Sequence, residues 1–193
     1  MDGYLIDEVR DYCSVFVLLV LCCYSFKFSL QANEHGYVYV AVDWKGLCDE
    51  DVVTIGLMLL TNLTDFRIVP DRLHQGMLDA LYSMRMMVTS FKDDPSMQVN
   101  GSSIIRDSSK TSYYGNSCGG IYGTVYMGVS QDVTEGVIGV GGAPFSLLLP
   151  RSVDFEAMRD IMYLAYSGTL ERPALLAIAQ VSVLNLYVPL MGG

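Results

Sequence analysis

The run "GNSCG", at positions 115–119, places one serine between two glycines with the spacing G-x-S-x-G. "TSYYG" at its start is typical of a short strand, and "CGGIYGTVYMGVS" after the serine is helix-like. Ser117 is therefore predicted to lie on a sharp strand-to-helix turn, where Gly115 and Gly119 approach each other too closely for side chains. This spacing predicts a nucleophilic hydroxyl. A glycine-rich turn without chemistry is an equally simple interpretation.

The predicted position of Ser117 favours acyl transfer. At a helix N-terminus, backbone N–H groups stabilise negative charge that develops nearby, and the N–H of Cys118 is one oxyanion donor. Attack of the Ser117 hydroxyl on an acyl carbon would give an acyl-enzyme, which water then hydrolyses. Such a serine needs a base. The two histidines of the chain, His35 and His74, both precede it.

Other kinds of site are disfavoured. The chain has an odd number of cysteines, five, without a C-x-x-C pair, so neither a disulfide framework nor a zinc site is expected. The acidic run at positions 49–51 could contact a cation, but a solvated loop is simpler, because adjacent side chains do not converge on one ion. Gly139, Gly141 and Pro144 fail the dinucleotide pattern G-x-G-x-x-G at its third glycine. We expect no metal and no cofactor.

Composition limits the class of protein. The 193 residues are 51% hydrophobic and 17% charged, enough for one domain with a large core. The net charge of −9 argues against nucleic-acid binding, which needs a basic surface. The apolar excess favours contact with a membrane or another protein through exposed apolar surface.

Residues 1–31 differ from the rest. They contain an apolar run at positions 15–24, shorter than the ~20 residues that a spanning helix needs. The acidic start "MDGYLIDEVRD" is unlike the basic region of a signal peptide. Residues 13–26 therefore allow a secretion signal, a membrane anchor, a non-native extension, or an internal buried strand or helix. The compartment stays open.

Residues 32–193 form the second predicted unit, with strand and helix in alternation. "YVYVAVD" at positions 37–43 is typical of a strand covered on both faces, and "GVIGVGG" at 136–142 of another buried strand. The polar stretch at 93–110 is predicted to be a surface loop. Between them, one apolar stripe has helical spacing: Leu73, Met77, Leu81, Met84 and Val88. This order predicts an α/β fold with a mostly parallel sheet and flanking helices.

Three stretches resemble α/β-hydrolases, most closely esterase or lipase-like members: "HGYVYVAVDWKGLCDEDV", "YYGNSCGGIYGTVYM" and "DVTEGVIGVGGAPFSLLLPRSVDF". The resemblance covers about residues 32 to 178. It implies that the second stretch is a nucleophile elbow, with Ser117 as nucleophile, the backbone N–H of Cys118 as oxyanion donor, and Gly115 and Gly119 as structural residues. It further implies a Ser–acid–His triad and a small acyl ester as substrate.

The chain also departs from this family. The family's triad follows the order serine, acid, histidine, whereas no histidine follows Ser117 here. The downstream acids come too early, and no HGGG-like oxyanion segment precedes His35. We therefore expect an incomplete α/β-hydrolase domain, a fragment of a serine ester hydrolase that is inactive alone. The alternative is a non-catalytic, hydrolase-like protein that binds a partner or a membrane.

Overall fold

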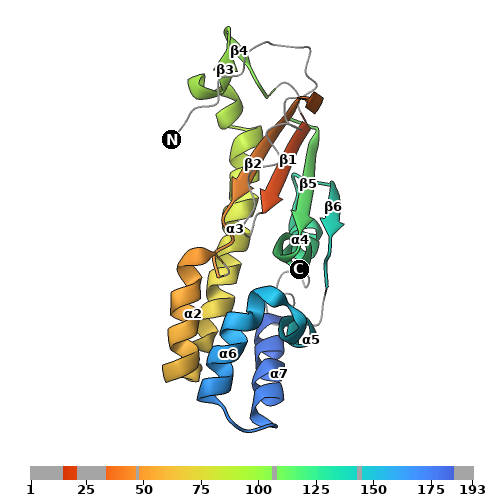
Figure 1. Cartoon of the computed structure of the whole chain (residues 1–193). Coiled ribbons are helices and arrows are strands. Elements are labelled where there is room, and N and C mark those ends of the chain that lie inside the picture. Colours follow the sequence, from red (N-terminus) through yellow and green to blue (C-terminus); the bar gives the residue numbers. More distant parts are fainter. Residues whose placement is uncertain (1–14, 21–33, 47, 106–107, 143–144, 185–193) are drawn as a thin grey trace.

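Figure 1 shows a computed structural model of the chain, which describes residues 15–20, 34–46, 48–105, 108–142 and 145–184. Strands and helices alternate along it, so the predicted mixed α/β class is confirmed. The strands are β1 (Val15–Val20), β2 (Tyr37–Val42), β3 (Gln98–Val99), β4 (Ser102–Ser103), β5 (Thr111–Asn116) and β6 (Glu135–Gly139). The α-helices are α2 (Asp49–Thr61), α3 (Ile68–Val88), α4 (Cys118–Val129), α5 (Phe145–Leu148), α6 (Glu156–Ala165) and α7 (Glu171–Leu184).

The main sheet has the order β2-β1-β5-β6, and every pair in it is parallel. β1 pairs with β2 from Val15 opposite Tyr37, and with β5 from Phe16 opposite Thr111. The apolar run near the N-terminus thus contains a strand between two others, as its unbroken apolar sequence allows. Residues 13–14 and 21–26 of the same prediction lie outside the described part. The division of the chain at residue 31 stays a prediction.

Helices α3 and α4 cover one face of this sheet. The connections β2-α3-β5 and β5-α4-β6 cross the sheet in the same direction, and right-handed crossovers then place both helices on the same side. In β5, Thr111, Tyr113 and Gly115 are buried, whereas the alternate residues are not. The buried apolar core joins this face to both helices: Trp44, Met58, Val69, Leu73, Met77, Ala80, Met84, Met87, Ile105, Tyr113, Tyr122, Val125, Tyr126 and Val133.

The apolar stripe predicted for α3 is confirmed. Leu73, Met77 and Met84 are buried, and Leu81 and Val88 pack against the core in part. α3 comes close to the segment after β2 at Gly76, where an added Cβ would lie 2.9 Å from the backbone nitrogen of Lys45. The stripe is core packing.

Two predictions about strands were wrong. β6 was expected to be buried, but it is the last strand of the described sheet, and Val137 and Ile138 are 61% and 40% exposed. Its apolar sequence resembles that of a central strand, and sequence alone does not show which strands pair with it. The polar stretch at 93–110 contains the hairpin β3–β4, whose Asn100 and Gly101 both have positive φ, as an Asn-Gly hairpin turn requires.

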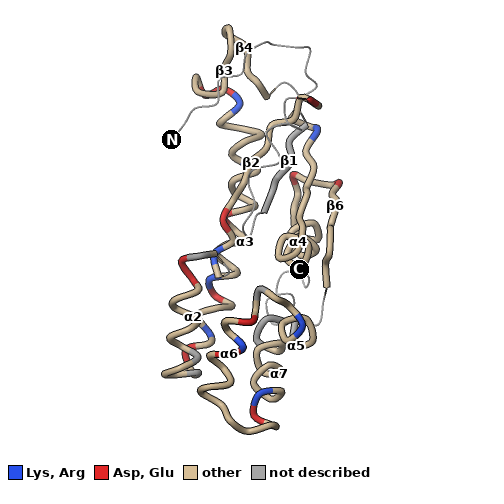
Figure 2. Tube along the Cα trace, viewed as in Figure 1, with Lys and Arg blue, Asp and Glu red and all other residues tan. Residues whose placement is uncertain are grey.

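Charged side chains are spread along the helices, with acidic and basic residues interspersed (Figure 2). Several form pairs between elements. Lys45 lies 2.8 Å from Asp79 in α3, and Arg85 at the end of α3 lies 2.7 Å from Asp132 before β6. These pairs tie α3 to both edges of the sheet.

Helices α5, α6 and α7 lie beyond the end of the sheet to which the arrowheads of β5 and β6 point (Figure 1). α7 begins at Glu171 and ends at Leu184, the last residue that the structure describes. No described helix is both long enough and apolar enough to cross a bilayer.

Candidate functional site

Ser117 lies on a strained turn between β5 and α4. Its backbone has φ 57° and ψ −116°, and it is the N-cap residue of α4. A residue with a side chain rarely adopts such a positive φ, and it costs about 1–3 kcal/mol that the surrounding structure must offset. The side chain is exposed. The strand–turn–helix context predicted from G-x-S-x-G is therefore present.

Gly115 has the steric role expected of it, and Gly120 has a similar one. A Cβ added to Gly115 would lie 2.2 Å from the carbonyl oxygen of Gly119 and 2.6 Å from its carbonyl carbon. At Gly120, in the first turn of α4, an added Cβ would lie 2.2 Å from the carbonyl oxygen of Gly139. Each of these atoms belongs to the backbone and cannot move aside as a flexible side chain would. The turn therefore requires glycine at these positions.

Hydrogen bonds to the end of β6 and to the first turn of α4 hold Ser117 in place. Its N–H donates to the carbonyl oxygen of Gly139 at 3.1 Å. Its own carbonyl oxygen accepts from the N–H groups of Gly120 at 2.8 Å and Ile121 at 3.0 Å. Val140, beside Gly139, also has a positive φ, 51°, which is rare for a β-branched residue. Two strained residues thus lie at the carboxyl ends of neighbouring strands.

Tyr113 stabilises the turn through a hydrogen bond to Gly119. Its hydroxyl donates to the carbonyl oxygen of Gly119 at 2.5 Å, and its ring stacks on Tyr126 with centroids 5.1 Å apart. Burial raises the pKa of Tyr113 well above its ordinary value and that of Tyr126 to about 12, so both remain protonated at neutral pH. The sequence analysis did not identify this residue. The alternation of buried positions in β5 would have placed it on the same face as Gly115.

The place of Ser117 in the sheet favours a ligand site. From β1 the chain continues to β2, toward one edge of the sheet, and from β5 it continues to β6, toward the other edge. The strand order therefore reverses between the neighbouring strands β1 and β5. In open parallel sheets, ligands bind at the carboxyl ends of the strands at such a reversal. Ser117 follows β5 at this point. A second oxyanion donor, expected upstream of His35, falls outside the described residues.

His35 lies toward the opposite end of the sheet from Ser117, and neither histidine is hydrogen-bonded to the Ser117 hydroxyl. His35 precedes the amino end of β2, and its ring lies 5.7 Å from that of Tyr37. Ser117 follows the opposite, carboxyl end of a parallel strand, and six residues of strand span roughly 17–20 Å. His74 is half-buried in α3. Within the described residues, no hydrogen bond joins the Ser117 hydroxyl to either imidazole or to a carboxylate.

The downstream acids have other surroundings. Asp132 pairs with Arg85, and Glu135 begins β6 at the amino edge of the sheet. Glu171 accepts a hydrogen bond from the N–H of Gly168 at 2.9 Å. Asp132 and Glu171 thus hold local structure. That the downstream acids come too early in the chain to complete a triad stays a prediction.

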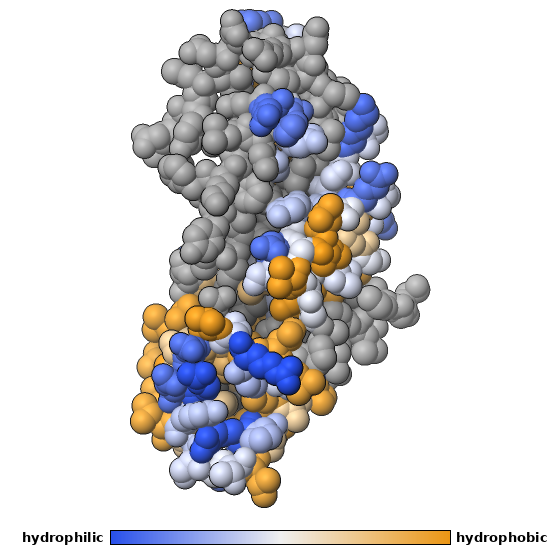
Figure 3. All heavy atoms as spheres, turned by 45° about the vertical axis from the view of Figure 1, so that its right-hand side comes forward, coloured by the Kyte–Doolittle hydropathy of each residue, from blue (hydrophilic) through white to orange (hydrophobic). Residues whose placement is uncertain are grey.

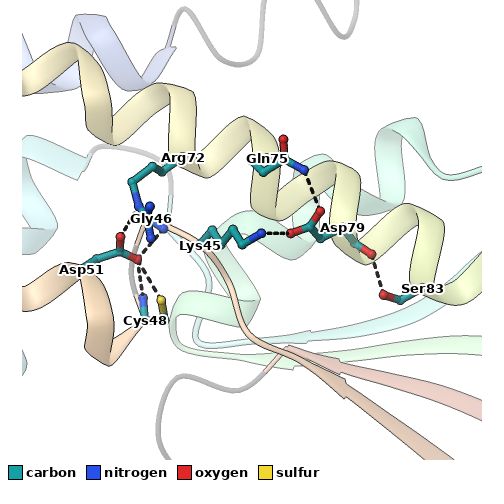
Figure 4. Close-up of polar contacts among 8 residues, drawn as sticks. All are labelled: Lys45, Gly46, Cys48, Asp51, Arg72, Gln75, Asp79 and Ser83. Carbon is teal, nitrogen blue, oxygen red and sulfur yellow. Dashed lines mark hydrogen bonds and ion pairs between the residues drawn. The ribbon is translucent and has the colours of Figure 1, made fainter.

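The acidic run at positions 49–51 was predicted to be a solvated loop, which is wrong. It begins α2, and Asp51 is 1% exposed. Figure 4 shows Gly46, Cys48 and Arg72 around the Asp51 carboxylate. The Asp51 carboxylate accepts hydrogen bonds from the N–H groups of Gly46 at 2.6 Å and Cys48 at 3.1 Å, from the Cys48 thiol at 2.9 Å, and from the Arg72 guanidinium. Burial alone raises the pKa of Asp51, but these donors together hold it below its ordinary value.

Asp51 is therefore a structural anchor that joins the loop after β2 to α2 and α3. In the described part of the chain, no group of His, Cys, Asp and Glu is arranged to hold a metal ion. Trp44, which follows β2 in this loop, is 3% exposed and stacks on Tyr122 with centroids 5.3 Å apart. It packs the core beside the same loop.

The chain was compared with family models, with curated proteins and with solved structures, and nothing matched in any of the three.

Proposed function

We propose that Ser117 is the nucleophile of a serine ester hydrolase that acts on a small acyl ester. The observation that carries this proposal is the backbone of Ser117, held at φ 57° and ψ −116° on an exposed strand-to-helix turn. A strained conformation kept in place by close glycine contacts presents the hydroxyl to solvent, beside the N-terminus of α4. A turn that only connected two elements would not need this strain.

In this mechanism the Ser117 oxygen attacks the acyl carbon, and the carbonyl oxygen becomes an oxyanion. The backbone N–H of Cys118, at the first position of α4, is the proposed donor to it. The oxyanion collapses, the alcohol leaves with a proton, and water hydrolyses the serine ester. A neutral hydroxyl without a base is a weak nucleophile. We therefore propose that, in this chain alone, Ser117 is acylated slowly by the ester.

We further propose that the sheet is part of an α/β-hydrolase core. The parallel order β2-β1-β5-β6 and the reversal of strand order beside Ser117 support this finer assignment. The turn with glycine at Gly115 and Gly119, followed at once by α4, supports it as well.

Labelling with a fluorophosphonate probe tests the proposal, because the probe reacts covalently with activated serine hydroxyls. We expect a single adduct, which peptide mass spectrometry places on Ser117, and no adduct in Ser117→Ala. Ser90→Ala is the matched control, since Ser90 is an exposed serine after α3 and far along the chain from the turn. Labelling of Ser90 or of several serines would contradict the proposal.

The second candidate function is a hydrolase-like protein without catalysis that binds a partner or a membrane. It is favoured by the absence of a histidine within hydrogen-bonding reach of Ser117 among the described residues. Large exposed apolar side chains also favour it, for example Leu164 and Leu170. Two results together would select this function. The folded protein would stay unlabelled, and it would release p-nitrophenol from p-nitrophenyl acetate no faster than Ser117→Ala does.

A further inference from the structure

A pocket of about 350 Å³ lies among α5, α6 and α7, away from the residues of the Ser117 turn. Apolar side chains form most of its wall, among them Leu147, Leu176 and Met162, the last of which is 4% exposed. This volume lies at the lower end of the range of small-molecule sites. Figure 3 shows hydrophobic surface beside hydrophilic groups at the lower end of the molecule, where these helices lie.

Direct contacts hold the walls of the pocket together. The N–H of Ser146 in α5 donates to Oε1 of Gln180 in α7 at 2.9 Å. Arg172 in α7 donates from Nε and Nη2 to the carbonyl oxygens of Tyr166 and Ser167, at 3.1 and 3.0 Å. Its guanidinium carbon also lies 4.1 Å from the centre of the Tyr163 ring. These contacts hold α5 and the α6–α7 connection in place around the pocket.

The charged side chains that line the pocket are both cationic, Arg159 and Arg172. Among the described residues, Arg159 forms ion pairs with Glu156, at 3.8 Å, and Asp160, at 3.5 Å, on the exposed side of α6. Both distances exceed the usual length of a charged hydrogen bond, and no hydrogen bond joins the guanidinium to another described residue. A ligand carboxylate can therefore hydrogen-bond to the guanidinium, in competition with these two acids.

We propose that this pocket binds a monocarboxylate with an apolar chain. The carboxylate would pair with the Arg159 guanidinium, whose donors match both carboxylate oxygens, while Arg172 adds positive charge at the same wall. The chain would lie against Leu147, Met162 and Leu176. The site is separate from Ser117 and does not depend on the function proposed for that residue.

Calorimetric titration with decanoate tests the proposal, and decanol serves as a probe of the same chain length without the charge. We expect decanoate to bind at one site and at least about tenfold more tightly than decanol, because the charged hydrogen bonds add to the apolar contact. Arg159→Gln should weaken decanoate at least about tenfold and leave decanol unchanged. Arg67→Gln, an exposed arginine outside the pocket, is the matched control and should change neither.

A second measurement does not depend on variants. A photoreactive fatty acid should crosslink to residues 146–177, and decanoate should compete with it. Ser117→Ala should bind decanoate like the parent chain, so failure here and failure of the proposed hydrolase are distinguishable. Equal affinity for decanoate and decanol, no effect of Arg159→Gln, crosslinking elsewhere, or no binding would each overturn the proposal.

Discussion

The β5–α4–β6 unit and the helices α5–α7 are built in different ways. In the first, backbone atoms meet at glycines, and the rings of Tyr113 and Tyr126 are buried completely. In the second, Met162 is the buried residue of α6 among those described. Leu164 at the end of α6 and Leu170 just before α7 are each 84% exposed. Close backbone contact fixes one conformation in the first region. The second depends on a few side-chain contacts and leaves both a pocket and apolar surface accessible.

A glycine-to-alanine substitution in the β5–α4–β6 unit and one in α2, opposite Ile161 of α6, give the largest expected contrast. Gly115→Ala would place a Cβ 2.2 Å from a backbone oxygen, so we expect a loss of at least about 3 kcal/mol in the free energy of unfolding. Gly56→Ala in α2 would meet only Ile161 at 3.6 Å, and alanine favours helix, so a gain of about 0.5–1 kcal/mol is expected. Urea unfolding followed by the fluorescence of Trp44, the one tryptophan, measures both. Equal effects would refute the contrast.

A substitution at Asp51 tests how much the contacts between the loop after β2, α2 and α3 contribute to stability. Asp51→Asn removes the buried negative charge that pairs with the half-exposed Arg72. We expect a loss of about 2–3 kcal/mol in the free energy of unfolding at pH 7. Because the pKa of Asp51 is lower in the folded state, its contribution is complete above the unfolded pKa, ~3.9, and disappears as the pH falls through the folded value.

The stability of the parent chain and of Asp51→Asn should therefore converge below pH ~4. Urea unfolding from pH 7 to pH 3 measures this, with Asp65→Asn, an acid in the 3₁₀ turn after α2, as the control. A difference that stays constant over this range would show that Asp51 does not act through its charge.

Tyr113 tests how the turn is held. Tyr113→Phe keeps the stacking on Tyr126 but removes the hydroxyl that donates to the buried carbonyl oxygen of Gly119, and we expect a loss of about 1–2 kcal/mol in the free energy of unfolding. Fluorophosphonate labelling of Ser117 should slow as well, because the turn loses a support. Tyr82→Phe, in an exposed part of α3, should change neither quantity. Slower labelling at unchanged stability would show a role in the reaction that goes beyond support.

The exposed leucines should have the smallest effect on stability. Leu164→Ser and Leu170→Ser remove side chains that are almost wholly in solvent, so we expect changes within about 0.5 kcal/mol. Self-association should decrease, because exposed apolar surface drives it. Size-exclusion chromatography at several concentrations measures this. A large loss of stability would instead mean that these leucines are covered in solution.

The local geometry at Ser117 could be predicted from sequence because its cause is local. Two glycines at fixed spacing, a β-rich run before them and a helix-like run after them specify the turn through steric contacts between near neighbours. The stripe of α3 was predictable for a similar reason, since helical periodicity and burial coincide at Leu73, Met77 and Met84.

Other features required the tertiary structure. The sequence of β6 is as apolar as that of a central strand, and only the strand order makes it the last in the described sheet. Asp51 resembles any acid in an acidic run until Arg72, 21 residues away, meets it. The distance between Ser117 and the histidines was equally undetermined. Contacts between residues far apart in the chain depend on how the elements pack, and a single sequence records only the local preferences of each.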